Sequence, residues 1–533
     1  MREPLDAPEL RAFSQAAWAR HLGPGARPFS PAALAQGSLA AAFHETAQRR
    51  AGHPALAIDG IEVTHAQLDE RAARTAGWLT GRGVAAGDRV LLAAPTSHAM
   101  VAAYLGILRA GAAVVLANPT LTERELSHLW RDSEATLALG LGDAAARLAA
   151  IDPRRAVDVA GAEDPATPLG CAIIQAAPLA PVEQRPDALA LLAYTSGTTG
   201  TPKAVPLTHG NLLSSIRAAM LAWRWREDDV LTHALPLFHQ HGLGGVHATL
   251  LGGSRAIVHS RFDAERLIRS FTTDGATVLF AVPAVYEQLA AALEARTPTP
   301  ATTLRVAISG SAPLSPALAE RVERLLDQRP LERYGTTESG LDVSNPYDGP
   351  RRPGTVGLPL PGVDLAIVRD GRPLPDGEHG EIALRGPQVF AGYRGNAQAT
   401  AEAFHPGGWF RTGDLGFIDP ADGFLTISGR LKELIISGGM NVYPREVALV
   451  LEQAPGVAHV AVVGMPSARW GEEVVAAVVP AAGPPPDPAA LIAFARERLA
   501  PYKCPKRVVF LDALPTNAVG KVVAADVVRM IGA

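Results

Sequence analysis

The sequence predicts an α/β protein with a large N-terminal domain of parallel α/β sheets plus a β-rich subdomain, followed by a small α+β C-terminal domain. The 533 residues exceed what one hydrophobic core usually organises. Apolar strand-length runs alternate with helix-length segments through much of the chain. The pattern changes to short strands and turns near Gly354, and to a compact mixed unit after Gly429. These three observations together predict the fold class.

The N-terminal domain is predicted to contain repeated strand and helix units. Residues 1–37 show weak periodicity and are interpreted as an arm or short helices lying on the first domain. Residues 88–94 and 112–119 are predicted strands, and the helix between them, at 98–111, ends at a glycine. The same alternation recurs with strands at 232–237, 253–260, 276–283 and 304–310. Such repeats predict parallel sheets covered by helices on both faces.

Two other patterns follow in the last third of the chain. Residues 361–386 contain short strands separated by Gly and Pro turns, which predicts the β-rich subdomain. Residues 431–533 combine strands with two helices, at 443–455 and 488–500, which predicts the small α+β domain. We place the boundary at residues 430–432, so the predicted domains are 1–430 and 431–533.

The composition indicates a globular protein with a small-molecule ligand. Hydrophobic residues make up 47% of the chain and charged residues 19%, which leaves little room for extended disorder. The 49 basic and 53 acidic side chains give a net charge of −4, and no basic block suggests nucleic acid or an anionic membrane. We therefore expect no nucleic-acid partner.

The cysteines and the apolar runs favour a cytoplasmic location. Cys171 and Cys504 lack the spacing of zinc ligands and are too few for a disulfide framework, which fits a reducing compartment. The most membrane-like run, residues 99–119, is interrupted by Arg109, and residues 1–10 contain no apolar signal core. We expect neither a membrane span nor an export signal.

The stretch YTSGTTGTPK, residues 194–203, is a candidate phosphate-binding loop. It follows the apolar run at 188–193 and precedes a predicted helix, a position from which backbone N–H groups can point at an anion. Glycines let the backbone approach a ligand, and hydroxyls add donors. The loop does not match the Walker A pattern, because Pro202 stands where that pattern needs a glycine before Lys203. The alternative interpretation of such a composition is a flexible linker.

The longer string YTSGTTGTPKAV resembles the signature of the adenylate-forming superfamily, which includes acyl-CoA synthetases, luciferases and peptide-synthetase adenylation domains. The resemblance implies that this loop binds the β- and γ-phosphates of ATP, with Thr195 also a catalytic residue and a ligand of Mg²⁺. The phosphate-binding residues would be Thr195, Ser196, Gly197, Thr198, Thr199, Gly200 and Lys203.

The superfamily's other motifs occur in the same order. They are GSAP at 310–313, YGTTE at 334–338, RTGDLG at 411–416, GRLKELIISGGMNVYP at 429–444 and PTNAVGK at 515–521. The resemblance implies an adenine side formed by Gly310, Ser311, Ala312, Tyr334, Gly335 and Thr336, with Thr337 near the α-phosphate and Glu338 as a catalytic ligand of Mg²⁺. It further implies Asp414 and Arg430 on the ribose, Lys432 as an interdomain pivot, Gly438 and Gly439 along a pantetheine tunnel, and Lys521 as the catalytic lysine.

The segment expected to contact the acid resembles the acyl-pocket entrance of the family. It is LPLFHQHGLGG at 235–245, and the implied acid-binding residues are His239, Gly310, Gly335 and Gly340. His239, His241 and His247 could suggest a metal, but zinc would need a further ligand. We interpret His239 as a pocket residue and His241 as its packed, hydrogen-bonded neighbour.

The run ERYGTTESGLDVSNPYDG, residues 332–349, is close to malonyl-CoA synthetases, which favours a dicarboxylic acid. A second carboxylate needs a cation, preferably an arginine. The family's arginine before the Gly-Gly-Ser turn is absent, because Leu250, Leu251 and Gly252 occupy that stretch. Arg255 could substitute for it or could equally cap a strand. Short-chain, medium-chain and aryl acids therefore stay open.

The resemblance predicts an AMP-forming acid–thiol ligase that uses ATP, Mg²⁺ and coenzyme A. The acid would attack the α-phosphorus of ATP, and rotation of a mobile C-terminal domain about Lys432 would then admit the thiol. One alternative keeps adenylation but passes the acid to a carrier protein, an amine or another nucleophile. Another is a non-catalytic ligand-binding relative, against which Lys521, Glu338 and Asp414 together argue.

Overall fold

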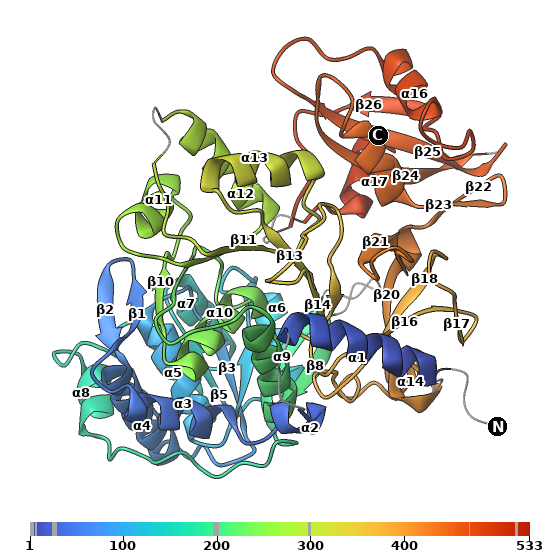
Figure 1. Ribbon diagram of the computed structural model, residues 1–533. Coiled ribbons are helices and arrows are strands. Elements are labelled where there is room, and N and C mark those ends of the chain that lie inside the picture. The colour runs from blue at the N-terminus through green and yellow to red at the C-terminus, as the bar shows by residue number, and fades with distance from the viewer. Residues whose placement is uncertain are drawn as a thin grey trace.

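The computed structural model describes residue 5 and residues 8–23, 29–195, 202–296, 300–467, 469–517 and 521–532. Two large sheets form the N-terminal part, an antiparallel sheet follows, and a fourth sheet forms the C-terminal unit at one end of the molecule (Figure 1). The predicted fold class, parallel α/β sheets with a β-rich subdomain and a C-terminal α+β unit, is confirmed.

The first sheet has six strands, in the order β6-β5-β3-β4-β7-β8. They are β3 (Arg89–Ala93), β4 (Ala113–Leu116), β5 (Leu137–Gly140), β6 (Ala156–Asp158), β7 (Leu189–Thr195) and β8 (Lys203–Thr208). All neighbours are parallel except β7 and β8. Strands β4 and β5 are buried at every position, which explains their unbroken apolar sequences.

Helices cover both faces of this sheet. They are α4 (His65–Gly81), α5 (His98–Arg109), α6 (Glu123–Ser133) and α7 (Asp143–Ile151), and the short α8 (Pro168–Gln175) packs on α4. Alternate residues of β3 divide between two cores. Leu92 packs in the core that contains Leu68 and Met100 of α4 and α5, whereas Leu91 packs with Leu126 of α6. The predicted strand–helix–strand unit is therefore present.

The second sheet has nine strands, in the order β15-β14-β13-β12-β11-β9-β10-β1-β2. They are β1 (Pro54–Ile58), β2 (Ile61–Thr64), β9 (Val230–His233), β10 (Arg255–Val258), β11 (Val278–Ala281), β12 (Val306–Ser309), β13 (Leu331–Tyr334), β14 (Val343–Ser344) and β15 (Leu358–Pro359). Its middle is parallel, and antiparallel pairs close both edges. The carboxyl ends of β12 and β13 therefore lie at the same edge, which positions the motifs that follow them.

The helices that belong to this sheet supply the walls of the site. They are α3 (Leu39–Arg49), α9 (His209–Ala222), α10 (Gln240–Gly252), α11 (Ala264–Thr272), α12 (Pro283–Glu294) and α13 (Pro316–Leu326). Thr208 caps α9 through a capping box with Asn211, and Asp263 caps α11. None of the helices in the described part of the chain combines the length and apolar character that crossing a bilayer requires.

The β-rich subdomain is an antiparallel sheet in the order β17-β16-β18-β20-β19, with β21 on β20. Its strands are β16 (Asp364–Arg369), β17 (Arg372–Pro373), β18 (Gly380–Arg385), β19 (Phe404–His405), β20 (Trp409–Ile418) and β21 (Leu425–Arg430), and α14 (Ala397–Glu402) precedes β19. Helix α1 (Pro8–Leu22) lies against β16, where Trp18 Nε1 donates to the Val363 carbonyl at 2.9 Å. The short α2 (Pro31–Leu34) packs on α9. The N-terminal segment thus covers the large domain, as expected.

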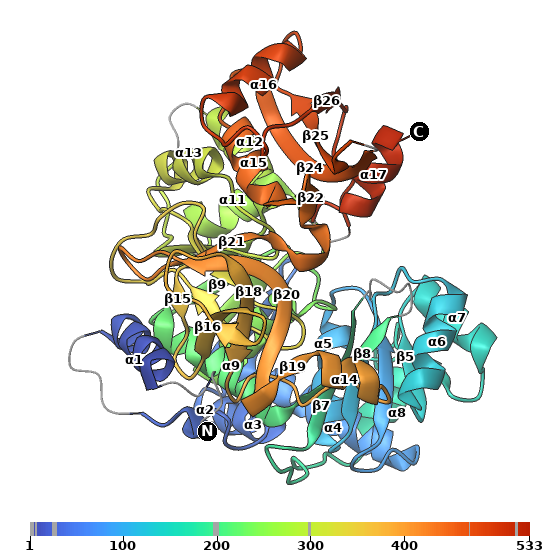
Figure 2. The same ribbon diagram turned by 90° about the vertical axis from the view of Figure 1, so that its right-hand side faces the viewer.

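The C-terminal unit is a sheet of β23-β22-β25-β24 with β26 on β25. Its elements are β22 (Ile435–Ser437), β23 (Met440–Val442), α15 (Pro444–Leu451), β24 (Val457–Ser467), β25 (Gly471–Pro480), α16 (Pro488–Arg496), β26 (Arg507–Phe510) and α17 (Ala524–Gly532). The prediction of two helices was wrong, because α17 is a third. Val527 and Ile531 bury its apolar side against the sheet. This unit follows β21 and stands above the rest of the molecule (Figure 2).

Candidate active site

One cleft of about 2050 Å³ gathers the predicted motifs from all four sheets. Of the predicted residues, those that line it are Thr195, Lys203, His239, Ser311, Ala312, Tyr334, Gly335, Thr336, Thr337, Glu338, Gly340, Asp414, Arg430, Lys432 and Lys521. Ser196, Gly197, Thr198, Thr199 and Gly200 lie outside the described residues. Segments more than three hundred residues apart in sequence thus share one cavity.

The predicted ribose site is a fixed polar triad of Tyr334, Asp414 and Arg430. Asp414 on β20 and Arg430 at the end of β21 are cross-strand partners, and Arg430 Nε lies 3.0 Å from Asp414 Oδ1. The Tyr334 hydroxyl, from β13, donates to Asp414 Oδ2 at 2.6 Å. Burial, with the charge of Asp414 adding to it, raises the pKa of Tyr334 well above its usual range, so the phenol stays protonated. Since a carboxylate has about four acceptor positions, Asp414 can still accept from ribose hydroxyls.

Lys521, from the C-terminal unit, lines the same cleft as this triad. Its backbone N–H donates to Asn517 Oδ1 at 3.0 Å, and the Asn517 N–H donates back to the Lys521 carbonyl at 2.9 Å, so two hydrogen bonds join these residues. Burial and the nearby Arg430 charge lower the pKa of Lys521, while Asp414 opposes that shift. The lysine thus faces the part of the cleft that holds the predicted ribose site of Tyr334, Asp414 and Arg430, here called the nucleotide end.

Glu338 offers a carboxylate at the mouth of the YGTTE turn. Tyr393 donates its hydroxyl to Glu338 Oε1 at 3.0 Å, and no hydrogen bond to Oε2 is found among the described residues. Beside it, the Thr337 carbonyl accepts from Gln240 Nε2 at 3.0 Å. Mg²⁺ prefers oxygen ligands and often uses one or two carboxylates together with substrate phosphates. The Glu338 carboxylate and the Thr195 hydroxyl fit that requirement.

The phosphate loop lies between two antiparallel strands. Thr195 at the end of β7 pairs with Lys203 at the start of β8. The helix predicted after the loop is present as α9, which begins at His209, and β8 lies between the loop and this helix. The Lys203 ammonium lies 4.7 Å from the centre of the Tyr393 ring.

Two glycines are required by close packing: Gly335 within YGTTE and Gly340 two residues after it. A Cβ on Gly335 would lie 1.8 Å from the Gly340 carbonyl oxygen, and Gly340 has φ +74° with the Ser215 hydroxyl beside it. The Gly340 N–H donates to the Thr336 carbonyl at 2.8 Å, which closes the turn. Gly310 is packed against Arg333, whose Nε would lie 2.4 Å from an added Cβ. Gly335 and Gly340 line the cleft, whereas Gly310 is not among the described residues that line it.

The part of the cleft where the acid is expected to bind, here called the acyl end, has apolar walls from α9, α10 and β11. They include Ile216, Ala219, Leu243, Ala248 and Phe280. Burial lowers the pKa of His239, and lowers that of His247 to about 3. Burial, then Arg333, lowers the pKa of His241 well below its usual value. All three imidazoles are therefore neutral near pH 7. His241 Nδ1 bonds Ser311 Oγ at 3.1 Å, and His247 Nε2 bonds the Tyr104 hydroxyl at 2.9 Å.

Arg255 does not supply a cation to this end. It begins β10, and its Nη2 lies 2.6 Å from Glu62 Oε2 of β2. It is not among the described residues that line the cleft. Of the two roles considered for Arg255, the strand-end role is the one the structure shows.

Arg333 is the buried cation of the acyl end, and it was not identified from the sequence. Burial lowers its pKa to about 10, so it stays charged near neutral pH. Among the described residues, its Nε and Nη2 have no hydrogen-bond partner, and the same holds for His239 Nε2, His241 Nε2 and Ser309 Oγ. Asp342 lies nearby, but burial raises its pKa to about 7, and Ser339 and Gln388 already donate to it. A lone arginine in a strand carries no sequence signal; only its burial identifies it.

The hinge region joins the two parts of the chain through polar and aromatic contacts. Lys432 lies in the short turn Leu431–Glu433 and lines the cleft. The rings of His379 and Tyr443 stack at 4.7 Å across the two parts. Gly438 and Gly439 occupy the turn between β22 and β23 and are not among the described residues that line the cleft. The structure thus does not bring them to the nucleotide site.

Comparisons with known proteins agree with this arrangement. The AMP-binding enzyme family matches residues 43–394, and the AMP-binding enzyme C-terminal domain matches residues 446–521. A feruloyl-CoA synthase from Amycolatopsis is 37% identical over 89% of this chain and 95% of its own length. ATP-bound MatB from Rhodopseudomonas palustris, a malonyl-CoA synthetase, has a TM-score of 0.85 at 36% identity, covering 92% of this chain and 98% of MatB. The amide bond synthetase McbA from Marinactinospora thermotolerans has a TM-score of 0.82 at 29% identity, covering 92% and 100%.

Proposed function

The chain belongs to the AMP-binding enzyme family, and from this premise we propose that it activates a carboxylic acid with ATP and then transfers the acyl group to coenzyme A. The first step forms an acyl-adenylate and releases pyrophosphate, and the second forms the acyl-CoA and releases AMP. The observation that carries the proposal is the meeting of Lys521 from the C-terminal unit with Asp414 and Arg430 of the large domain, in a cleft that Glu338 also lines.

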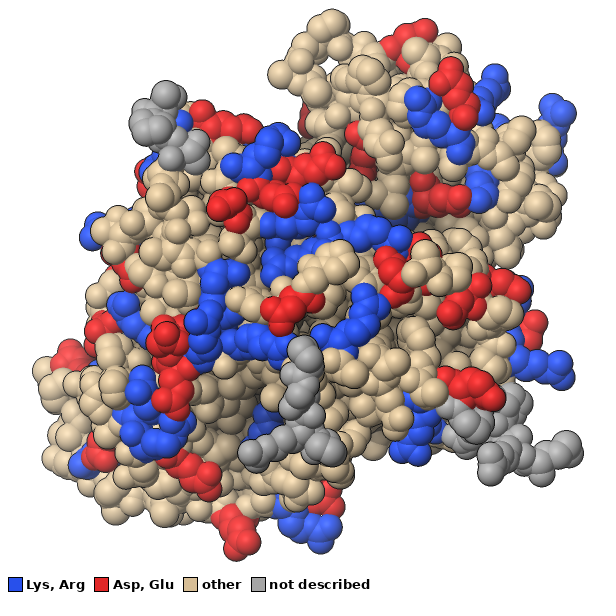
Figure 3. All heavy atoms as spheres, in the orientation of Figure 1, with Lys and Arg blue, Asp and Glu red and all other residues tan. Residues whose placement is uncertain are grey.

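The adenylation step joins two anions, so positioning and charge neutralisation dominate it. Asp414 holds the ribose, Lys521 faces the α-phosphate and the attacking carboxylate, and Lys203 holds the leaving phosphates. A magnesium ion, when bound at Glu338 and Thr195, would neutralise phosphate charge. Figure 3 shows Lys and Arg side chains gathered in a band across the middle of one face, below the C-terminal unit.

The thioester step requires a different placement of the C-terminal unit. Lys521 occupies the nucleotide end in this arrangement, while Gly438 and Gly439 lie away from it. Rotation about Lys432 would withdraw the lysine and present the turn between β22 and β23 to the thiol. On this hypothesis Lys432→Pro keeps adenylation and loses thioester formation. Equal loss of both steps would argue against the hinge.

For the acid, we infer an apolar body that carries a hydrogen-bond acceptor within reach of Arg333. The apolar walls favour an aryl or alkyl portion, in line with the name of the feruloyl-CoA synthase. The unpaired nitrogens of Arg333 and of the imidazoles favour a carboxylate, carbonyl or hydroxyl substituent on the acid. A second carboxylate would be in line with MatB, a malonyl-CoA synthetase, whose acid is a dicarboxylate. Leaving such buried groups unpaired costs about 1–3 kcal/mol each, which a suitable acid would recover.

A second candidate acceptor is an amine, because the amide bond synthetase McbA shares the fold over its whole length. The test for both is pyrophosphate release with aryl, dicarboxylic and oxo acids, each run with coenzyme A, with an amine, and with neither. We expect turnover to continue beyond one equivalent only with coenzyme A. Turnover that ignores coenzyme A and responds to the amine would assign the second candidate.

A further inference from the structure

Residues 386–396, here called the crossing segment, join β18 to α14 and run across the motifs of the site. Asn211 Nδ2, on α9, donates to the carbonyls of Pro387 at 2.8 Å and Val389 at 2.9 Å. The Phe390 N–H donates to the backbone carbonyl of Glu338 at 2.8 Å. Three bonds therefore hold the first half of the segment against α9 and the YGTTE turn.

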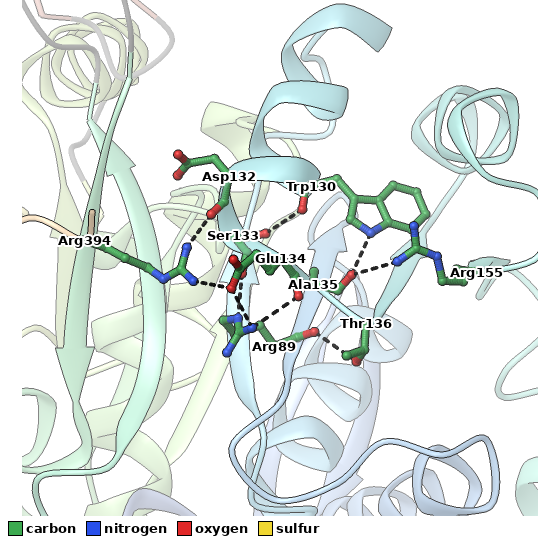
Figure 4. Close-up of polar contacts among 9 residues, drawn as sticks. All are labelled: Arg89, Trp130, Asp132, Ser133, Glu134, Ala135, Thr136, Arg155 and Arg394. Atoms are coloured by element: carbon green, nitrogen blue, oxygen red, sulfur yellow. Dashed lines mark hydrogen bonds and ion pairs between the residues drawn. The ribbon is translucent and has the colours of Figure 1, made fainter. Parts of the chain in front are cut away.

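The second half is anchored through Arg394. Its N–H donates to the Ala204 carbonyl at 3.1 Å, one residue beyond Lys203. Its guanidinium reaches the end of α6, where it contacts the Asp132 carbonyl and lies 2.6 Å from Glu134 Oε2 (Figure 4). Arg89 holds the same carboxylate oxygen from the other side at 3.2 Å. The segment is thus tied to β8 of the first sheet and to the YGTTE turn that follows β13 of the second sheet.

Tyr393 lies between these anchors and touches two site residues at once. Its hydroxyl donates to Glu338 Oε1 at 3.0 Å, and its ring lies 4.7 Å from the Lys203 ammonium. The Tyr393 N–H is held by Thr400 Oγ1 at 2.9 Å, and its ring packs edge-on against Phe390 at 5.0 Å. The ring orientation is therefore fixed by contacts other than those to the site.

We propose that Tyr393 is a positioning residue that holds the Glu338 carboxylate and the Lys203 ammonium in a common geometry for the metal-bound phosphates of ATP. This inference rests on the proposed function, since it assumes that the cleft binds ATP. The hydroxyl occupies one Glu338 oxygen and so directs the other toward a cation. The ring gives Lys203 an apolar and electron-rich surface, which limits the rotamers of a long, flexible side chain.

The hydroxyl contact with Glu338 and the ring contact with Lys203 should affect ATP binding under different conditions. Burial, with the Glu338 charge adding to it, raises the pKa of Tyr393 above its usual range, so the phenol keeps the proton that it donates. A hydrogen bond to a charged group contributes more than an exposed cation–π contact does. The hydroxyl should matter when Mg²⁺ is bound, and the ring should matter with or without it.

The test measures ATP binding by calorimetry, in excess Mg²⁺ and in EDTA, for the full chain without acid or acceptor. Tyr393→Phe removes the hydroxyl alone, and we expect binding of MgATP about ten-fold weaker with binding of metal-free ATP unchanged. Tyr393→Leu also removes the ring, and we expect metal-free ATP to bind about two- to five-fold more weakly as well. Melting temperatures of both variants report whether the fold is retained.

Tyr347→Phe is the matched control, because the Tyr347 ring packs against Arg305 and Arg351 and is not among the described residues lining the cleft. We expect it to bind MgATP as the unmodified chain does. In a Glu338→Gln background, Tyr393→Phe should add little, since the two residues act as a pair. Equal weakening of both ATP forms by Tyr393→Phe, or no weakening, would overturn the inference. Absence of ATP binding by the unmodified chain would instead overturn the proposed function.

Discussion

The two ends of the cleft differ in how their polar groups are satisfied. At the nucleotide end, Asp414 accepts a hydrogen bond from Tyr334 and forms an ion pair with Arg430. At the acyl end, buried nitrogens of Arg333 and His241 have no partner in the described part of the chain. On the proposed function, the prepaired groups are held in position before ATP arrives, whereas the unpaired groups can pair with the acid. The nucleotide end is therefore built for one constant ligand, and the acyl end for selection among acids.

The strongest test of the nucleotide end is Lys521→Ala. Removing one preorganised donor typically costs about 10²- to 10³-fold, so the rate of adenylation should fall by that factor while the melting temperature stays unchanged. Pyrophosphate release measures the rate. Lys506→Ala is a control on the same unit, since Lys506 Nζ donates to the Pro501 carbonyl, lies 5.7 Å from the centre of the Trp470 ring, and is not among the described residues that line the cleft. Normal adenylation by Lys521→Ala would remove this residue from the mechanism.

The same lysine predicts a pH dependence. Because burial lowers the pKa of Lys521, the ammonium loses its charge at lower pH than an exposed lysine, and adenylation should fall as pH rises through that lowered pKa. The arginine of Lys521→Arg keeps its charge at all accessible pH values, so the alkaline fall in the adenylation rate of this variant should move to higher pH. Identical alkaline limbs would show that another group titrates.

Asp414→Asn tests whether the contacts of Asp414 with Tyr334 and Arg430 matter for ribose recognition. The change leaves Arg430 without its charged partner and weakens an acceptor, so ATP affinity should fall about 10- to 100-fold. Binding of ATP and of 2′,3′-dideoxy-ATP measures the effect. The unmodified chain should prefer ATP, and the variant should lose most of that preference. A preference that survives in the variant would place the ribose elsewhere.

Arg333→Met tests the acyl end. The KM for the preferred acid should rise about ten-fold, because the substituent that pairs with the guanidinium loses its partner, while ATP affinity should stay the same. Arg333→Lys should recover part of the loss. A change in ATP affinity of the same size would mean that the two ends are not independent.

Glu332→Gln should have the smallest effect, on stability alone. Burial, opposed by the Gly354 N–H and by Arg445 of the C-terminal unit, raises the pKa of Glu332 from 4.5 to about 8. The folded state then holds a proton that the unfolded chain releases, so stability from this group falls as pH rises between these values, by at most about 1.4 kcal/mol per pH unit. The difference in melting temperature, variant minus unmodified chain, should therefore be larger at pH 8.5 than at pH 6. A constant difference would show that Glu332 does not titrate in this range.

Much of the fold could be predicted because strands such as 112–119 and 304–310 are continuous apolar runs between helical segments. Errors arose where local pattern was ambiguous. The strand at 203–208 was not predicted, because only its pairing with β7 identifies it as a strand. Helix α17 was missed because its apolar side is defined only by the sheet that covers it.

The motifs by themselves predicted the chemistry of the first step, since their order and their resemblance to the superfamily imply roles for Glu338, Asp414 and Lys521. Only the tertiary structure decided which polar groups are paired. Tyr393 and Glu338 lie 55 positions apart, and the contact between them follows from the path of the crossing segment. Arg333 is a candidate contact for the acid because burial removes it from water, and Nε and Nη2 have no partner among the described residues. Burial is a property of the packed chain, so the sequence alone does not show it.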